Sequence, residues 1–324
     1  MERRLRALDL LDARSGRDTV TWPSHLAGAA PPQPGPWRGP TSTPPGRHGS
    51  PRAARIGPWW QRHPTLGVVV VVAIIAAALA GPQGFKMLFP PRAEHLGGAD
   101  IPSRSSEEAP TRLLPVVATG AEPSRDQYAF LQTISGSQEP ITYDPCRPIH
   151  YVIRLHGHSP AAERLVLEAV DQVSRATGLK FVYDGPTDEV PSDHRAAFQP
   201  DRYGDRWAPV LVAWTDPDET RGLAGEVAGL GGSIPWSDTH GRPSYVTGTV
   251  WLDGPSLMPE VQDAGRRAAV RGVVIHELAH VVGAGHVRDQ HQIMAERGSL
   301  DGRLGSGDRY VLARLGQGEC APGL

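Results

Sequence analysis

Apolar and polar positions follow regular patterns only in the second half of the chain. Short apolar runs at 150–155, 209–214 and 245–252 are rich in β-branched and aromatic residues, which favours strands. A fourth run, at 179–183, directly follows a glycine and also predicts a strand.

Two longer segments predict helices. In 160–177 apolar residues recur at helical spacing, and Gly178 stands where the helix would end. Segment 261–284 includes the apolar run 273–275, as expected of a helix buried at the centre of a domain. The order strand, helix, three strands, helix predicts an α+β domain over residues 141–324.

The first part of the chain has a different composition. Residues 1–64 are crowded with proline, glycine and arginine, which predicts a disordered segment. The net charge of the whole chain is −2, but this segment holds ten arginines, no lysine and four acidic residues. Residues 86–140 show little periodicity and many turn-forming residues, and we interpret them as a stalk.

Between these segments lies a candidate membrane span. Residues 65–85 contain no charged side chain, and their length matches a hydrocarbon core of about 30 Å. Arginines precede the span, as do Trp59 and Trp60, which are typical of a membrane interface. The positive-inside rule then predicts a single-pass protein of the cell membrane with a cytoplasmic N-terminus and an extracellular folded domain. The alternative is a secreted protein after signal cleavage near Ala80.

The span also accounts for the arginine excess. We therefore interpret these arginines as membrane-flanking residues and expect no nucleic-acid partner. The sequence carries no signal for an oligomeric state.

The strongest chemical signal is the segment 276–286, which has the pattern His-Glu-x-x-His-x-x-Gly-x-x-His. His276 and His280 are four residues apart, so a helix places them on one face, where they can share a metal ion. Gly283 allows the left-handed conformation that ends the helix, and His286 then follows as a third ligand. Three protein ligands and an open fourth position are typical of a catalytic Zn²⁺ site.

The neighbouring carboxylate completes this prediction. Glu277 lies one step round the helix from His276, within reach of a water held at the metal. We expect Glu277 to be the general base for a water activated by Zn²⁺, which makes the chain a zinc hydrolase.

These residues resemble the metzincin metallopeptidases, most closely the matrixin-like branch. Seven residues separate His286 from Met294, and this spacing resembles that of the methionine turn under the zinc in matrixins. The resemblance implies a twisted mixed sheet, two long helices, a small irregular C-terminal subdomain and a peptide or protein substrate. It further implies that 225–235 is the edge strand that pairs with an extended substrate, although an ordinary loop is the alternative. Segment 305–316 resembles the closing helix, with Asp308 near its start.

Some features depart from that family or leave its function open. The chain reads Ala295–Glu296 after the methionine, without the tyrosine ligand of astacin-like relatives. His291 is either a solvated loop residue or a substrate contact. The alternative functions are hydrolysis of cell-wall peptides by a membrane-tethered enzyme, or a zinc-binding surface protein without catalysis. The alanine, arginine, glycine and proline content is similar to that of high-GC Gram-positive bacteria.

Cysteine usage fits an exported domain. The chain has two cysteines, Cys146 and Cys320, near the two ends of the predicted domain. In an oxidising compartment such a pair most simply forms one disulfide. The alternative is that Cys146 caps the zinc as a latency switch, although Cys146-Arg147-Pro148 does not match the matrixin prodomain motif.

Overall fold

The computed structural model describes only part of the chain. The predicted disordered segment 1–64 and the predicted membrane span 65–85 lie outside the described residues. Among the residues that are described, no helix combines the length and the apolar character needed to cross a membrane. The described ranges are 101–102, 108–157, 159–238, 240–296 and 301–324.

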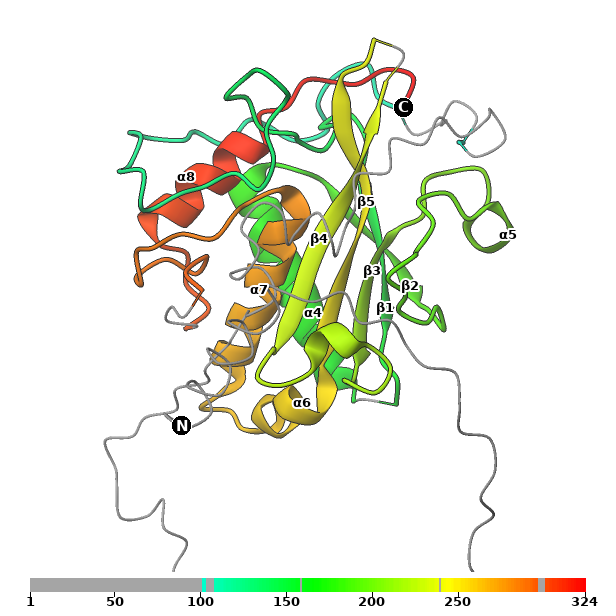
Figure 1. Ribbon diagram of the computed structural model, residues 1–324, viewed down its shortest axis with the longest axis vertical. Coiled ribbons are helices and arrows are strands. Elements are labelled where there is room, and N and C mark those ends of the chain that lie inside the picture. Colours follow the sequence, from blue (N-terminus) through cyan, green and yellow to red (C-terminus); the bar gives the residue numbers. More distant parts are fainter. Residues whose placement is uncertain (1–100, 103–107, 158, 239, 297–300) are drawn as a thin grey trace, which may run out of the picture. The chain divides into compact units, whose positions relative to one another are not determined.

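A five-stranded mixed sheet organises the described residues, in the order β2-β1-β3-β5-β4 (Figure 1). Strand β1 pairs in parallel with β2 and β3, and β3 pairs in parallel with β5. Strand β4 pairs antiparallel with β5 and forms one edge of the sheet. All four strands predicted from the apolar runs are present. The strands are β1 (Ile149–Arg154), β2 (Phe181–Pro186), β3 (Val210–Thr215), β4 (Gly229–Ser237) and β5 (Pro243–Asp253).

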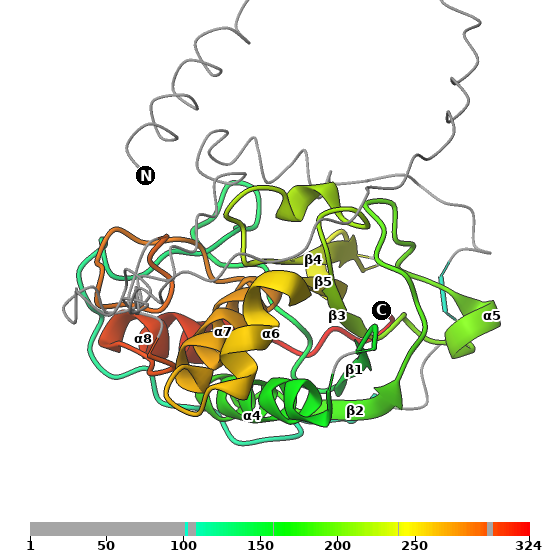
Figure 2. The same cartoon turned by 90° about the horizontal axis from the view of Figure 1, so that it is seen from below.

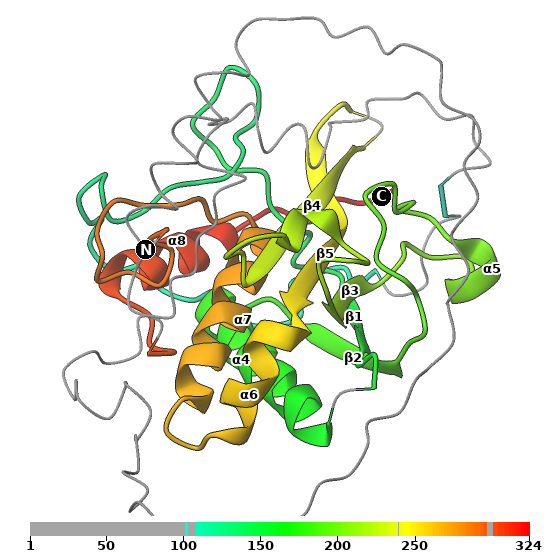
Figure 3. The ribbon, with the colours of Figure 1, turned by 60° about the horizontal axis from the view of Figure 1, so that its bottom comes forward.

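The long helices lie on one face of this sheet. Seen from below, α4, α6, α7 and α8 gather on the same side of the strands (Figure 2). Helix α4 packs against α7, and α7 packs against β4 and β5 (Figure 3). The helices are α4 (Pro160–Thr177), α5 (Pro200–Tyr203), the 3₁₀ helix η2 (Arg221–Leu223), α6 (Gly254–Gln262), α7 (Arg267–Val282) and α8 (Ser306–Leu315).

Both faces of the sheet are buried, which explains the apolar runs. In β3, Val210, Val212 and Trp214 belong to the main core under the helices. Their neighbours Leu211 and Ala213 belong to a smaller apolar cluster. Because successive side chains of a strand point to opposite faces, the two clusters lie on the two sides of the sheet.

The predicted helix 261–284 is wrong at both ends. Helix α6 ends at Gln262, and α7 begins only at Arg267. Between them the Asp263 carboxylate accepts a hydrogen bond from the Gly265 N–H at 2.8 Å. Such a local side-chain bond offers the backbone an alternative to the helix, which accounts for the break. At the other end, α7 ends at Val282 rather than at residue 284.

The described part of the predicted stalk packs against the sheet and helices. Tyr128 of the predicted stalk is buried in the main core together with Ile141 and Tyr143, which belong to the predicted domain. The boundary drawn at residue 140 therefore falls inside a packed segment. The boundary was misplaced because this segment is buried by tertiary contacts. It forms few regular elements of its own, so its burial leaves no periodic pattern in the sequence.

The two cysteines are joined. Cys146 and Cys320 form a disulfide with a Cα–Cα distance of 5.3 Å, as predicted for an oxidising compartment. Cys146 precedes β1, and Cys320 follows α8 in the C-terminal segment. This pairing removes the alternative in which the Cys146 thiol caps a metal ion.

Candidate metal centre

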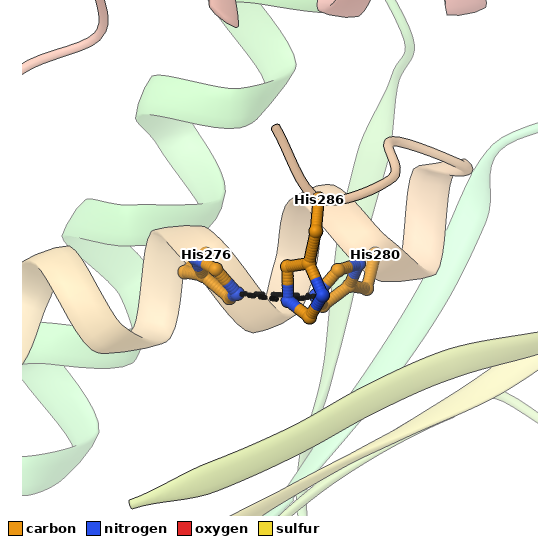
Figure 4. A group of neighbouring side chains, drawn as sticks. All are labelled: His276, His280 and His286. Atoms are coloured by element: carbon orange, nitrogen blue, oxygen red, sulfur yellow. Dashed lines mark hydrogen bonds between the residues drawn. The ribbon is translucent and has the colours of Figure 1, made fainter. Parts of the chain in front are cut away.

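The structure brings the three histidines of the motif together. His276 and His280 project from the same face of α7, and His286 returns to them after the helix ends (Figure 4). The Nε2 atom of His276 lies 3.1 Å from that of His280 and 3.2 Å from that of His286. The Nε2 atoms of His280 and His286 are 3.1 Å apart. Three ring nitrogens thus converge on one point.

The other ring nitrogens of the two helical histidines fix their tautomers. His276 Nδ1 lies 2.6 Å from the Ile293 carbonyl oxygen, and His280 Nδ1 lies 2.8 Å from the Ala284 carbonyl oxygen. A carbonyl oxygen only accepts, so each Nδ1 carries the hydrogen. In the neutral ring Nε2 then holds a lone pair. The short contact between the Nε2 atoms of His276 and His280 in Figure 4 is therefore between two lone pairs.

This donor set fits a metal ion better than protons. Burial lowers the pKa of His276 to about 4, and burial with the nearby His276 lowers that of His286 to about 3. The pKa of His280 is also well below its usual range, mainly through burial. Tetrahedral bonds of about 2.0–2.1 Å to zinc place ligand nitrogens about 3.3 Å apart, close to the spacing observed.

The other candidate cluster in the described part of the chain does not offer free ligands. It consists of Asp144, Cys146 and Cys320, and its two sulfurs are bonded to each other.

Gly283 follows the last residue of α7 in the left-handed conformation that the motif predicts, although the predicted helix 261–284 ran one residue past it. Its φ of +111° is in the left-handed region that favours glycine, and its N–H bonds to the Ala279 and His280 carbonyls. A Cβ here would lie 3.0 Å from Leu315 Cδ2 and 3.1 Å from Tyr245 Cε2. Both the backbone conformation and the close packing therefore require glycine at the point where the chain turns towards His286.

The predicted methionine turn is buried and tied to the first ligand. Met294 is 0% exposed, and the carbonyl of the preceding Ile293 accepts the bond from His276. Asp308, on the first turn of α8, accepts bonds from the Ile293, Met294 and Gly305 N–H groups. The carboxylate thus joins the turn, the start of α8 and, through Ile293, a candidate metal ligand. The position of Asp308 near the helix start was predicted from the sequence, but its bonds to the turn were not.

Glu277 is buried beside β4. Its side chain is 1% exposed, and among the described residues Oε1 has no hydrogen-bond partner. Burial raises the pKa of the Glu277 carboxyl to about 8. A Cβ on Gly229 would lie 2.8 Å from Glu277 Cγ, so the side chain reaches this strand. An isolated buried carboxylate is costly, and such strongly shifted groups are common at functional sites.

Glycines allow β4 to lie unusually close to α7. A Cβ on Gly231 would lie 2.2 Å from the Glu277 carbonyl oxygen. The alternation of Gly229 and Gly231 puts two residues without side chains on the face that meets the helix. The segment 225–235, for which strand and loop were both open, therefore contributes an edge strand that contacts the motif helix.

We expect Gly231→Ala to destabilise the protein. The added methyl group would force β4 away from the backbone of α7, and overpacking of this kind typically costs about 1–3 kcal/mol. Urea unfolding of the purified chain measures the change. The matched control is Gly265→Ala, because a Cβ there meets only Asp263 Oδ1 at 3.3 Å. Equal unfolding free energies for the two variants would contradict the close approach.

Comparisons with known proteins show distant similarity to solved structures. No protein-family model matches the sequence, and no curated protein matches it. Among solved structures it is similar to archaemetzincin from Methanopyrus kandleri, with 16% identity and a TM-score of 0.33 over 52% of this chain and 92% of that one. Archaemetzincin from Archaeoglobus fulgidus, in complex with malonate, shows 15% identity and a TM-score of 0.25 over 45% of this chain and 84% of that one.

A third similar structure is a fish enzyme. High choriolytic enzyme 1, a hatching enzyme zinc-protease from the medaka Oryzias latipes, shows 14% identity and a TM-score of 0.24. The match covers 49% of this chain and 55% of that one, so this chain spans about half the length of that relative. Because all three TM-scores are low, these similarities assign no activity to this chain.

The remaining candidates lie apart from the histidine cluster or at its rim. His291 is exposed, and its N–H bonds to the Asp289 carboxylate. Tyr310 packs its ring against Tyr128, with 4.7 Å between the centroids. Glu296, at the position where astacin-like relatives have a tyrosine, has Oε1 3.8 Å from His286 Nδ1. That distance is too long for a hydrogen bond but short enough for an electrostatic contribution.

A further link between β4 and α7 was missed from the sequence. Ser233 Oγ donates to the Val281 carbonyl at 2.7 Å and also lies 2.7 Å from the Tyr143 hydroxyl. Val281 is in the last turn of α7, whose carbonyls lack partners within the helix. The bond from β4 therefore supports the end of the helix near His280. A single serine in a strand carries no signal from which this role could be predicted.

Proposed function

We propose that this chain is a zinc-dependent endopeptidase of the metzincin type, with a matrixin-like methionine turn. One observation carries the proposal: the Nε2 atoms of the three histidines converge, at zinc-like spacing, beside the helix that also holds the buried Glu277. Structural zinc sites use four protein ligands, whereas a catalytic site uses three and keeps one position open. The motif supplies three.

The proposed chemistry divides between the ion and the chain. When bound at the three histidines, zinc would supply the Lewis acidity that polarises a peptide carbonyl and acidifies water. Glu277 would take the proton from the attacking water and then deliver it to the leaving amine. A positive charge at the histidines favours the ionised form of Glu277 and opposes the effect of burial. Its pKa would then lie closer to neutral pH, where one group can both accept and donate.

The proposed substrate is a peptide or protein in an extended conformation. Among the described residues β4 pairs only with β5, so its other edge is available to a further strand. Strand β4 also contacts α7 next to Glu277. A peptide that added itself to this edge would gain backbone hydrogen bonds and pass close to the base.

We also propose the cellular setting. The span 65–85 would anchor a bacterial protein in the cell membrane with the peptidase domain outside, and the disulfide between Cys146 and Cys320 supports an oxidising location. Recovery of the full-length chain from membranes by detergent, and not by a high-salt wash, tests the anchor. Recovery of a chain that starts near residue 81 would instead support the secreted alternative.

Hydrolysis with and without a chelator tests the proposed function. We expect the purified full-length chain to cleave casein or a library of quenched peptides, to lose this activity in a chelator, and to regain it with zinc. Peptides from the cell wall are included as a separate substrate set. Cleavage of the cell-wall peptides alone would show that they, and not general peptides or proteins, are the substrate class. Zinc binding without cleavage of any peptide would contradict an enzymatic function and favour a zinc-binding surface protein.

A further inference from the structure

The segment 126–131 pairs with the loop that carries His286. The Leu131 N–H donates to the Gly283 carbonyl at 2.8 Å, and the Gly285 N–H donates to the Ala129 carbonyl at 2.9 Å. Phe130 and Ala284 form an antiparallel bridge. Further along, the Asp126 carbonyl accepts from the N–H groups of residues 288 and 289, at 3.2 and 3.1 Å. These bonds lie on both sides of His286.

Side chains hold the same segment in place. Gln127 Nε2 donates to the Asp289 carboxylate at 2.8 Å. Tyr128 is 5% exposed and packs edge-on against Tyr310 of α8. A Cβ on Gly307 would lie 1.9 Å from the Gln127 carbonyl oxygen, so the first turn of α8 has a glycine where the segment crosses it. The segment therefore lies between α8 and the His286 loop in a fixed position.

His286 depends on such outside support more than the other two histidines do. His276 and His280 belong to α7, and each has Nδ1 bonded to a backbone carbonyl. His286 follows the end of the helix, and among the described residues its Nδ1 has only the 3.8 Å contact to Glu296. Its loop is held on one side by the Val287 N–H bond to the Met294 carbonyl. Segment 126–131 holds the other side.

We propose that residues 126–131 are a positioning strap that sets the place of His286 in the metal site. The proposal rests on the metal site of the proposed function. Because ordering a ligand at the moment of binding costs free energy, loss of the strap would weaken metal binding and alter the ligand arrangement. None of these contacts is made to Glu277 or to the ring of a helical histidine. The strap reaches His286 through its loop, and it also holds Ala284, whose carbonyl oxygen lies 2.8 Å from His280 Nδ1.

Two substitutions in the full-length chain test the strap, each with a matched control. Leu131→Pro removes the N–H that bonds to Gly283, and Leu113→Pro removes an N–H that bonds to the Pro145 carbonyl, away from the loop. Gln127→Ala removes the bond to Asp289, and Gln317→Ala removes a glutamine bond to the Val117 carbonyl. Each of the four substitutions removes one hydrogen bond between residues 108–140 and a later part of the chain.

Zinc affinity, from competition with a chelator, is the first measurement. The second is the visible spectrum of the Co²⁺-loaded protein, which reports the ligand arrangement and would not respond to a general loss of stability. We expect the two strap variants to bind zinc roughly 10- to 100-fold more weakly than the wild type and to change the Co²⁺ spectrum, as loss of outer support for a ligand does. The controls should match the wild type in both.

The outcomes separate the strap from the proposed function. Equal zinc affinities and spectra in the wild type, the strap variants and the controls would overturn the strap alone. A wild-type chain that binds no metal would overturn the proposed function and the strap with it. If Leu131→Pro lowers the folded fraction in circular dichroism, Gln127→Ala decides, because its partly buried side chain can be removed without a change to the backbone.

Discussion

Glu277→Gln should remove peptide hydrolysis and leave the metal in place. The amide has nearly the same size as the carboxylate and fits the buried position beside Gly229, but it cannot take a proton from water. Loss of a general base typically costs about 10²- to 10⁴-fold in rate. We therefore expect kcat/KM on a quenched peptide to fall by that amount while elemental analysis finds the wild-type zinc content.

A second carboxylate provides the matched control. Glu296 lies near the site, 3.8 Å from His286 Nδ1, but its side chain is 46% exposed. Glu296→Gln should change kcat/KM far less than Glu277→Gln does. If Glu277→Gln keeps wild-type activity, or if Glu296→Gln is the more damaging variant, the assignment of the base is wrong.

His280→Ala should lose the metal itself. His280 contributes one of three converging nitrogens, and two ligands remain in its absence. The affinity for zinc should fall by more than the 10- to 100-fold that loss of an outer partner costs. We expect almost no zinc in the purified variant by elemental analysis and no chelator-sensitive hydrolysis.

His291→Ala is the control for this loss. His291 is exposed and lies on the same downstream segment, outside the cluster of ring nitrogens. Its removal should leave the zinc content unchanged. A raised KM with unchanged zinc content would assign His291 to substrate contact. Loss of zinc from His291→Ala, or retention of zinc by His280→Ala, would contradict the ligand set.

Local signals predicted the elements that carry the site. Helix α4 has the bounds predicted from its apolar spacing, because Pro160 suits a first turn and Gly178, with a φ of +70°, suits the end. The three histidines lie within eleven residues, so a helix and one glycine turn are enough to bring them together. No long-range contact had to be known.

The parts that the sequence did not reveal depend on long-range contacts. Segment 126–131 pairs with a loop more than 150 residues away, and irregular backbone pairing leaves no period in the sequence. The bonds from Asp308 to the turn at 293–294 are of the same kind, although a carboxylate on a first helical turn was expected. The helix break at Asp263 is the exception, because its local signal, an aspartate two residues before a glycine, stands in the sequence.

The disulfide makes a covalent ring of most of the folded domain. Cys146 and Cys320 are 174 residues apart, and the sheet, α7 and all three histidines lie between them. A single backbone cut anywhere in this ring leaves the pieces joined as one molecule, which matters for a domain that we propose to be a peptidase working outside the cell. The strap lies outside the ring. A cut in residues 132–145 would leave the strap attached by noncovalent contacts alone. Such a cut could separate the metal site from its strap while the disulfide ring stays closed.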